Sequence, residues 1–389
     1  MVGPAILPAL NLVRYQHPDD PWAFGHATEE PAEVGELERE ELMKLAKNAI
    51  VVNTLQDIYS SRHKNRRCES STLTSTESLR FTRALYRIML FQRVFPGKTT
   101  IYIDDADTEQ EREIRAARKA FFAMYTTAEL REIYAVNNFI EALGTWLVRK
   151  VLNQDYARCD HAIVVPAEVF LHAYQERNPR LINRHFAHET FAGANNLLVG
   201  YVTDPVQAVW KERGEVSLSD SFNHILDHIE EQDDICKQCG TKAGIELWSA
   251  SNWATQNATS LAFLPCILET LHMAGELPHN AWERAVLQAH MRRGVSLEDL
   301  LAELFALKRL PAFSSWRPED AICLNCLKRF VTQHLHLWLL ERKREAGQFI
   351  GPDCWYGYHC RVHLIHHDEE HARSFNHLCQ ARGYWDDGS

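Results

Sequence analysis

Apolar residues recur along much of this chain at alternating spacings of three and four, which is the period of an amphipathic helix. The clearest stripe begins after Thr126-Thr-Ala-Glu129, where the threonine and the glutamate are spaced as in a capping box. The stripe consists of Ile133, Val136, Ile140, Leu143 and Leu147. We expect a long helix here, with this stripe facing a core.

The same signals predict two further helices. Thr74-Ser-Thr-Glu77 has the form of a second capping box, and Leu85, Ile88 and Met89 then share one helical face. Near the other end of the chain a long helix is expected to run until Gly347. Its stripe consists of Leu324, Leu327, Val331, Leu335 and Trp338.

Weaker patterns complete the picture. Ser219–Gln232 and Ser296–Leu310 are predicted to be helical. Thr99–Asp105 is the best candidate for a short strand, and the acidic residues Asp104, Asp105 and Asp107 indicate a loop. The segment from Met1 to Gly35 contains several prolines and little periodicity, so an extended arm is expected.

Composition restricts the class of protein. The chain has 389 residues, of which 46% are apolar, and a mild formal charge of −10, so it can bury a large core but lacks the basic character of proteins that coat nucleic acid. No run approaches the roughly 18 apolar residues of a membrane span, and the first residues do not resemble a signal peptide. A nuclear or cytoplasmic location is expected. There, ten cysteines favour metal ligation over disulfides.

Four cysteines stand in two Cys-x-x-Cys pairs. Cys236 and Cys239 are followed by a glycine, as in a zinc knuckle, and Cys323 and Cys326 lie on one face at the start of the predicted long helix. Together they offer a tetrahedral four-sulfur zinc site that would clip two distant segments together. The alternatives are ordinary thiols or a thioredoxin-like redox pair, although neither pair follows a strand in a βαβ context.

The most specific local pattern lies at the C-terminal end. Cys354 and Cys360 are followed by His371 and His377, which completes a closed shell of two sulfurs and two imidazoles for a second zinc ion. Tyr356 and Phe375 are expected to form the apolar core of this finger. Four nearby residues are alternative ligands: His363, His366, His367 and Cys379.

Cys354-Trp-Tyr-Gly-Tyr-His-Cys360 and the histidines after it resemble the poly(ADP-ribose)-binding zinc finger. That resemblance implies a zinc-folded module, but Arg361 and Val362 replace the residues that help to hold the adenine group in that family. The wider region, from the first cysteine pair to Tyr358, resembles a family of uncharacterised fungal proteins, some with an F-box-like N-terminus. This second resemblance implies helical architecture and paired zinc sites.

These observations predict a mainly α protein, with a multi-helix body, zinc-clipped helices and a small C-terminal zinc finger. The expected divisions are an extended arm at 1–35, a helical domain at 36–215, a helical zinc-binding domain at 216–347, and the finger with a tail at 348–389.

Three function classes follow. The expected function is a non-catalytic, zinc-stabilised interaction or adaptor protein with a protein partner, because no phosphate loop, nucleophile elbow or dinucleotide fingerprint occurs in the sequence. One alternative is a nucleic-acid or poly(ADP-ribose) binder, in which Arg361, Arg373 and the basic patch 342–344 contact phosphate; the simpler interpretation of the patch is a solvated helix end. The other is a zinc hydrolase, since His367-Asp-Glu-Glu370-His371 has the order of inverted zinc proteases.

Overall fold

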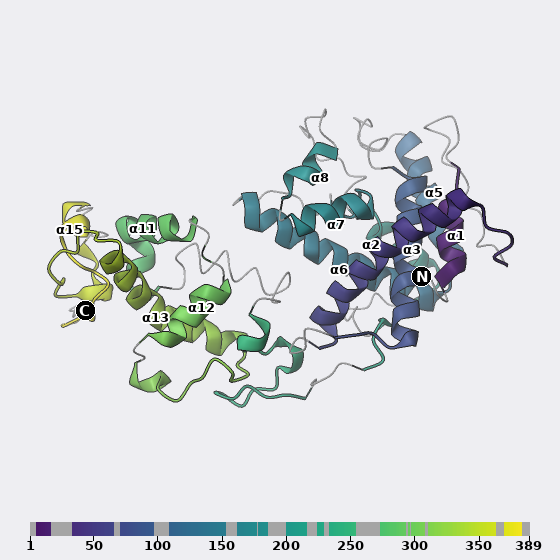
Figure 1. Cartoon of the computed structure of the whole chain (residues 1–389). Coiled ribbons are helices and arrows are strands. Elements are labelled where there is room, and N and C mark those ends of the chain that lie inside the picture. The colour runs from purple at the N-terminus through teal and green to yellow at the C-terminus, as the bar shows by residue number, and fades with distance from the viewer. Residues whose placement is uncertain are drawn as a thin grey trace. The chain divides into compact units, whose positions relative to one another are not determined.

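The computed structural model describes most of the chain in segments separated by gaps. The described residues are 5–16, 33–65, 71–96, 109–152, 162–176, 178–185, 200–215, 224–228, 233–253, 273–292, 295, 297–307, 310–362 and 369–382. They contain twelve α-helices, and their only β pairing is three isolated bridges. The prediction of a mainly α fold is confirmed (Figure 1).

The chain divides into two compact units, which are described separately. The first consists chiefly of Met1–Asn65 and Glu69–Ile229, and the second chiefly of Glu230–Gln256 and Ser260–Ser389. The chain passes from the first unit to the second at residues 229 and 230, and the expected divisions at 35, 215 and 347 stay predictions. The finger expected as a separate part at 348–389 belongs to the second unit.

Eight of the described helices build the first unit. They are α1 Ile6–Arg14, α2 Arg39–His63, α3 Ser75–Val94, α5 Glu109–Ala123, α6 Thr127–Leu152, α7 Ala167–Gln175, α8 Arg180–His185 and α9 Thr203–Glu212. Helices α2, α3 and α6 pack around an aromatic cluster in which the ring of Tyr59 lies 4.9 Å from that of Phe81 and 5.2 Å from that of Phe139.

Both predicted capping boxes are present in this unit. The amide of Glu77 donates to Thr74 Oγ1 at 3.3 Å, and the Thr74 amide donates to the Glu77 carboxylate at 2.7 Å. The same reciprocal bonds join Thr126 and Glu129 at the start of α6. The predicted stripe of α6 is confirmed as a core face, since all its members are buried: Ile133, Val136, Ile140, Leu143 and Leu147.

The expectation of an extended arm is wrong for its first part, because Ile6–Arg14 forms helix α1. Ala9 and Leu10 are fully buried, and α1 packs on α2 and α3. Pro8 is tolerated because it stands in the first turn, where a backbone N–H has no intrahelical acceptor. Burial against two long helices thus outweighs the local proline signal.

The helix predicted over 219–232 is wrong for residues 224–228, which are turn and bend. Long-range contacts use their backbone instead: the Asp227 amide donates to Glu77 Oε1 at 3.0 Å, and the Ile225 carbonyl accepts from Arg80 at 3.1 Å. The predicted strand Thr99–Asp105 and its acidic loop lie outside the described residues.

The second unit contains four described α-helices, α11 Ala281–Arg292, α12 Leu297–Ala306, α13 Leu324–Glu345 and α15 Glu369–Ser374. Short 3₁₀ turns lie at Gly244–Glu246, Ala250–Asn252, Leu277–His279, Pro311–Phe313 and Gly357–His359. The predicted long helix is α13, and its buried face is the centre of the core. Phe330, beside the predicted stripe, stacks on Phe305 of α12 with ring centroids 4.2 Å apart, and Trp338 Nε1 donates to Glu303 at 2.6 Å.

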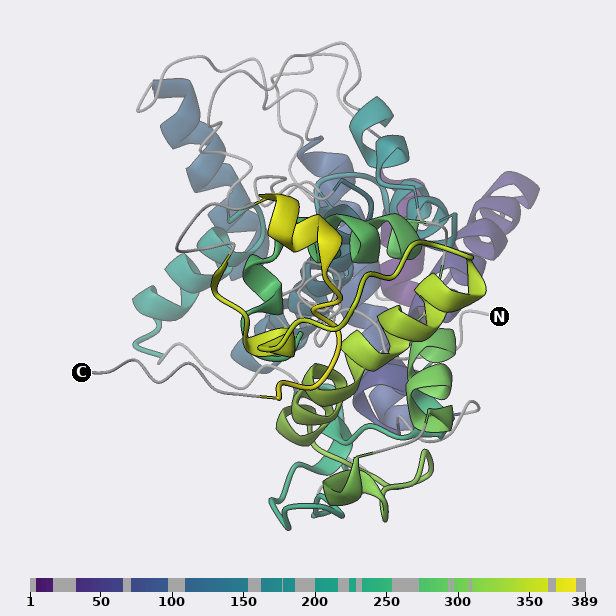
Figure 2. The ribbon, with the colours of Figure 1, turned by 90° about the vertical axis from the view of Figure 1, so that its left-hand side faces the viewer.

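The C-terminal finger packs on this core. Leu378 is fully buried in the same apolar cluster as α13, and the Glu276 amide donates to the carbonyl of Tyr358 at 2.8 Å. The ring of Tyr358 lies 5.2 Å from that of His336 on α13. In Figure 2 the yellow helix α15 lies beside the green α11, consistent with Arg373 placed 5.4 Å over the ring of Trp282.

Burial of His336 makes the second unit sensitive to pH. The side chain is 3% exposed, and desolvation lowers its pKa from 6.5 to about 4. Between those values the unfolded chain binds a proton that the folded chain does not. Stability therefore falls as the pH drops from about 6.5, by roughly 1.4 kcal/mol per pH unit.

We expect a His336→Phe variant to lose this part of the pH dependence while keeping a ring against Tyr358. Urea unfolding of both proteins, followed by tryptophan fluorescence between pH 7 and 5.5 with excess zinc, measures the difference. Both proteins carry the same cysteine and histidine clusters, so their difference isolates the imidazole. Equal slopes in the two proteins would contradict the expectation.

Candidate metal centres

The two Cys-x-x-Cys pairs come together in the second unit. Cys236 and Cys239 lie in a turn in which the Gly240 amide donates to the Cys236 carbonyl at 2.9 Å, while Cys323 is the N-cap residue of α13 and Cys326 lies in its first turn. The four sulfur atoms all lie within 4.8 Å of one another. The structure thus joins pairs that are far apart in the sequence.

Backbone pairing holds these two segments in register. Trp248 and Ile322 exchange two backbone hydrogen bonds of 2.8 and 2.9 Å, and the Lys237 amide donates to the Ala321 carbonyl at 2.8 Å. The side chain of Gln238 adds a bond of 3.0 Å to Asp320. These hydrogen bonds between the two segments therefore bring the two cysteine pairs next to each other.

The spacing of the sulfurs fits a tetrahedral metal ion. Cys239 Sγ and Cys323 Sγ are 3.7 Å apart, and all four cysteines are free thiols. Metal–sulfur bonds of 2.3 Å at a tetrahedral angle place two sulfurs about 3.8 Å apart, which matches the observed distance. A disulfide would require about 2.05 Å.

Local hydrogen bonds favour thiolates at Cys236 and Cys239, whereas burial raises the pKa of Cys323 and of Cys326. The Cys323 amide donates to Cys236 Sγ at 3.2 Å. Hydrogen bonds from Thr241 lower the pKa of Cys239 to about 6. Cys239 is exposed whereas Cys236 and Cys323 are buried, so one edge of the site meets solvent.

The second cluster lies in the finger. Cys354 and Cys360 flank the turn Gly357–His359, His371 lies on α15, and His377 follows that helix. Gly357 has φ +47°, and a Cβ at this position would lie 2.3 Å from the Cys379 carbonyl, so the tight turn requires glycine. The two halves are joined by the Cys354 amide, which donates to the Asn376 carbonyl at 3.0 Å.

Distances in this cluster also fit a closed shell. His371 Nε2 lies 3.7 Å from Cys354 Sγ and 3.4 Å from Cys360 Sγ. Tetrahedral bonds of ordinary length to one sulfur and one nitrogen place those atoms about 3.6 Å apart. Hydrogen bonds with Cys360 and the two histidines lower the pKa of Cys354 to about 3, which favours its thiolate.

None of the four alternative ligands belongs to this cluster as described: Cys379 is directed elsewhere, and the three histidines lie outside the described residues. Cys379 Sγ lies against the carbonyls of Cys354 (3.5 Å) and Asn376 (3.2 Å), and burial raises its pKa to about 11. His363, His366 and His367 lie outside the described residues.

The expected core of the finger is partly wrong. Phe375 is 37% exposed, and its ring lies 4.7 Å from that of His371. Leu378 and Ala372 are buried instead. Leu378 and Tyr358 pack on the helical core, so part of the finger's apolar contact is made with that core.

The predicted basic patch is largely engaged by carboxylates. Lys343 is buried and donates to both oxygens of Glu283 at 2.9 Å, and Arg361 Nε donates to Glu276 at 2.9 Å. The remaining pairs are Arg342 with Glu303, Arg344 with Glu341 and Arg373 with Glu369. The sequence does not predict the first three partners, because Glu283, Glu303 and Glu276 are distant in sequence and meet the basic residues only in the folded chain. The other two, Glu341 and Glu369, lie three or four residues from their partners in the same helix.

Comparison with known proteins identifies no relative of this chain. No family model matches it, and neither the curated proteins nor the solved structures contain a significant match. Among the described residues, no helix is both long and apolar enough to cross a membrane.

Proposed function

We propose that this chain is a non-catalytic interaction protein whose second unit is folded around two zinc ions. The observation that carries the proposal is that each cluster supplies four protein ligands at tetrahedral spacing. Four protein ligands leave no coordination position for water or substrate, which is the property of structural rather than catalytic zinc sites.

The donor atoms favour zinc over other common metals. Thiolate and imidazole in a tetrahedral arrangement suit zinc, whereas calcium and magnesium take oxygen ligands in larger or octahedral shells. The hydrolase alternative requires His371 to serve an open site, but its Nε2 faces the sulfurs of Cys354 and Cys360.

The placement of the clusters supports a bracing role. The first joins the 236–239 turn to the start of α13, and the finger that holds the second packs on His336 in the middle of the same helix. Helix α13 lies at the centre of the core. One ion would therefore stabilise the packing at its start, and the other the packing near its middle.

Exposed aromatic side chains support a protein partner. In the second unit Phe349 is 76% exposed, Trp355 60% and Trp282 42%. Aromatic residues of this kind are enriched in protein interfaces, and they dominate binding energy where a partner buries them. Pairing of the basic patch with carboxylates lends less support to a nucleic-acid or poly(ADP-ribose) role.

Affinity capture from native extracts of the source cells tests the proposal. The zinc-loaded chain is expected to retain a partner at constant stoichiometry, and a Phe349→Ala/Trp355→Ala variant to lose most of it. The matched control is Met43→Ala/Ile50→Ala, which truncates exposed apolar residues of the first unit.

Absence of any retained partner, or equal retention by both variants, would argue against this role. Salt-sensitive binding of purified protein to RNA, DNA or poly(ADP-ribose) would instead support the alternative.

A further inference from the structure

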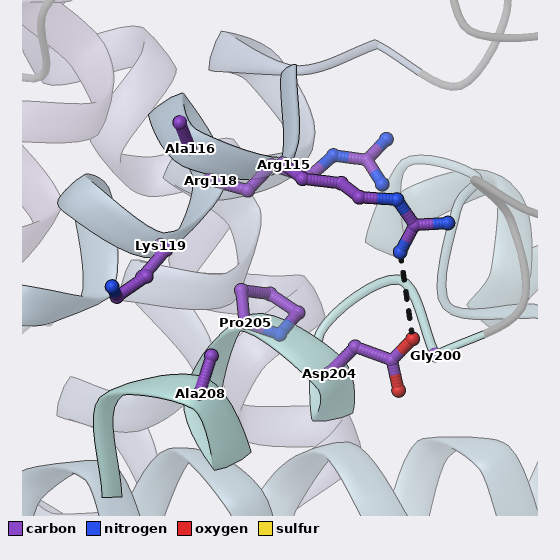
Figure 3. Close-up of a pocket in the computed structure, with 8 residues that line it drawn as sticks. All are labelled: Arg115, Ala116, Arg118, Lys119, Gly200, Asp204, Pro205 and Ala208. Carbon is purple, nitrogen blue, oxygen red and sulfur yellow. Dashed lines mark ion pairs between the residues drawn. The ribbon is translucent and has the colours of Figure 1, made fainter. Parts of the chain in front are cut away.

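A cavity of about 370 Å³ lies between α5 and α9 of the first unit, far in sequence from the cysteine clusters. It is lined by Arg115, Ala116, Arg118, Lys119, Gly200, Asp204, Pro205 and Ala208. Figure 3 shows that the three cationic side chains come from α5, while Asp204, Pro205 and Ala208 come from α9. Asp204 is the one carboxylate among the described residues of this lining.

Arg118 is a buried cation in the wall of the cavity. The residue is 3% exposed, and its guanidinium lies 4.5 Å over the ring of Tyr201, whose hydroxyl donates to the Phe95 carbonyl. Burial lowers the pKa of Arg118 to about 10, because the charged form loses contact with solvent.

Arg115 and Lys119 stand one helical turn apart on the same face of α5. The side chain of Arg115 is 43% exposed and that of Lys119 33%, so both can turn toward a ligand. Glu111 holds Arg115 at 2.7 Å and Glu212 pairs with Lys119, while neither carboxylate lines the cavity. Both cations belong to the lining of the cavity.

Asp204 faces this cationic wall from α9. Its carboxylate lies 4.0 Å from Arg115, and burial raises its pKa (Figure 3). Gly200 has φ +65°, and a Cβ there would lie 2.1 Å from the Asp204 carboxylate, so only glycine leaves this room. The carboxylate can accept a hydrogen bond from a ligand hydroxyl or amine.

We propose that this cavity binds a small phosphate monoester. The guanidinium groups of Arg115 and Arg118 offer paired donors to phosphate oxygens, and Lys119 adds an ammonium group. On binding, the phosphate would replace Glu111 as the partner of Arg115 and Glu212 as the partner of Lys119. Ala116, Pro205 and Ala208 provide an apolar wall for the organic part. The volume lies within the range of small-molecule sites.

Binding measurements on the full zinc-loaded chain test the site. Isothermal titration at constant ionic strength uses inorganic phosphate, glucose 6-phosphate and, as the neutral parent, glucose. Saturable binding of both phosphates and none of glucose is expected. Arg115→Gln/Lys119→Gln should weaken both phosphates by at least about tenfold, since two charge-assisted contacts are lost.

Two further variants separate a binding site from a general charge effect. Arg112→Gln/Lys211→Gln removes the same amount of charge, one residue from α5 and one from α9, outside the cavity and should leave binding unchanged. Asp204→Asn should bind inorganic phosphate several-fold more tightly, because a repelling carboxylate is removed while its shape is kept. Circular dichroism verifies that each variant is folded.

Absence of saturable phosphate binding by the wild-type chain would overturn the proposal. Equal weakening by the cavity variant and its control would also overturn it, since the effect would then be nonspecific screening of net charge. Binding of inorganic phosphate with no gain for glucose 6-phosphate would contradict the monoester and identify the free anion as the ligand.

Discussion

Replacing Cys354 with serine is expected to remove one zinc ion per chain and to unfold the C-terminal finger. The Cys354 sulfur is buried, and its partners Cys360, His371 and His377 would retain only three ligands for the ion. Zinc contributes on the order of 10 kcal/mol to the folding of small zinc modules, so the loss should exceed what the local apolar contacts can supply. Cys236→Ser should likewise remove one ion and release the 236–239 turn from α13.

Elemental mass spectrometry of protein purified without added metal measures this directly. Two zinc ions per chain are expected for the wild type and one for each variant, with a matching loss of stability in urea unfolding. Cys379→Ser is the matched control, because its sulfur lies against backbone carbonyls outside the ligand set. Wild-type protein without zinc, or loss of zinc from the control alone, would contradict the assignment.

Replacing Lys343 with methionine is expected to destabilise the second unit by about 3–5 kcal/mol. The Lys343 ammonium donates to both carboxylate oxygens of Glu283 at 2.9 Å, and the two side chains are 7% and 1% exposed. Removing one partner leaves the other as an unpaired buried charge, which is far more costly than the loss of a surface pair. Urea unfolding followed by tryptophan fluorescence gives the change.

The double variant Lys343→Met/Glu283→Leu should recover most of this loss, because both buried charges are then absent. Arg344→Met is the neighbouring control: its pair with Glu341 is 54% and 48% exposed, and such pairs contribute about 0–1 kcal/mol. If Lys343→Met and Arg344→Met lowered the free energy of unfolding by the same small amount, the expectation for a buried Lys343 pair would be wrong.

This ion pair also bears on function. Lys343 is the middle residue of the basic run 342–344, for which the sequence predicts a solvated helix end, with contact to phosphate as the alternative. In the structure it is a buried link between α13 and α11, and Arg342 pairs with Glu303 of α12. Part of the apparent patch therefore stabilises the helical core.

Local signals predicted much of the fold correctly. Capping boxes at Thr74 and Thr126, the stripe of α6 and the extent of α13 depend on residues three or four apart, and these interactions form wherever the chain is helical. The two wrong predictions concern segments whose structure depends on contacts distant in sequence. Helix α1 and the turn at 224–228 depend on burial and hydrogen bonds with α2 and α3, which no local pattern contains.

The sequence by itself determined the chemistry of the candidate metal centres, because only cysteine and histidine at close spacing offer such donors, and it paired the ligands within each segment. Only the tertiary structure decided that Cys236 and Cys239 meet Cys323 and Cys326, through the backbone pairing of Trp248 with Ile322. It also decided that Cys379 turns away and that Lys343 is buried. The physical reason is that donor chemistry belongs to single residues, whereas proximity and burial arise when distant segments pack together.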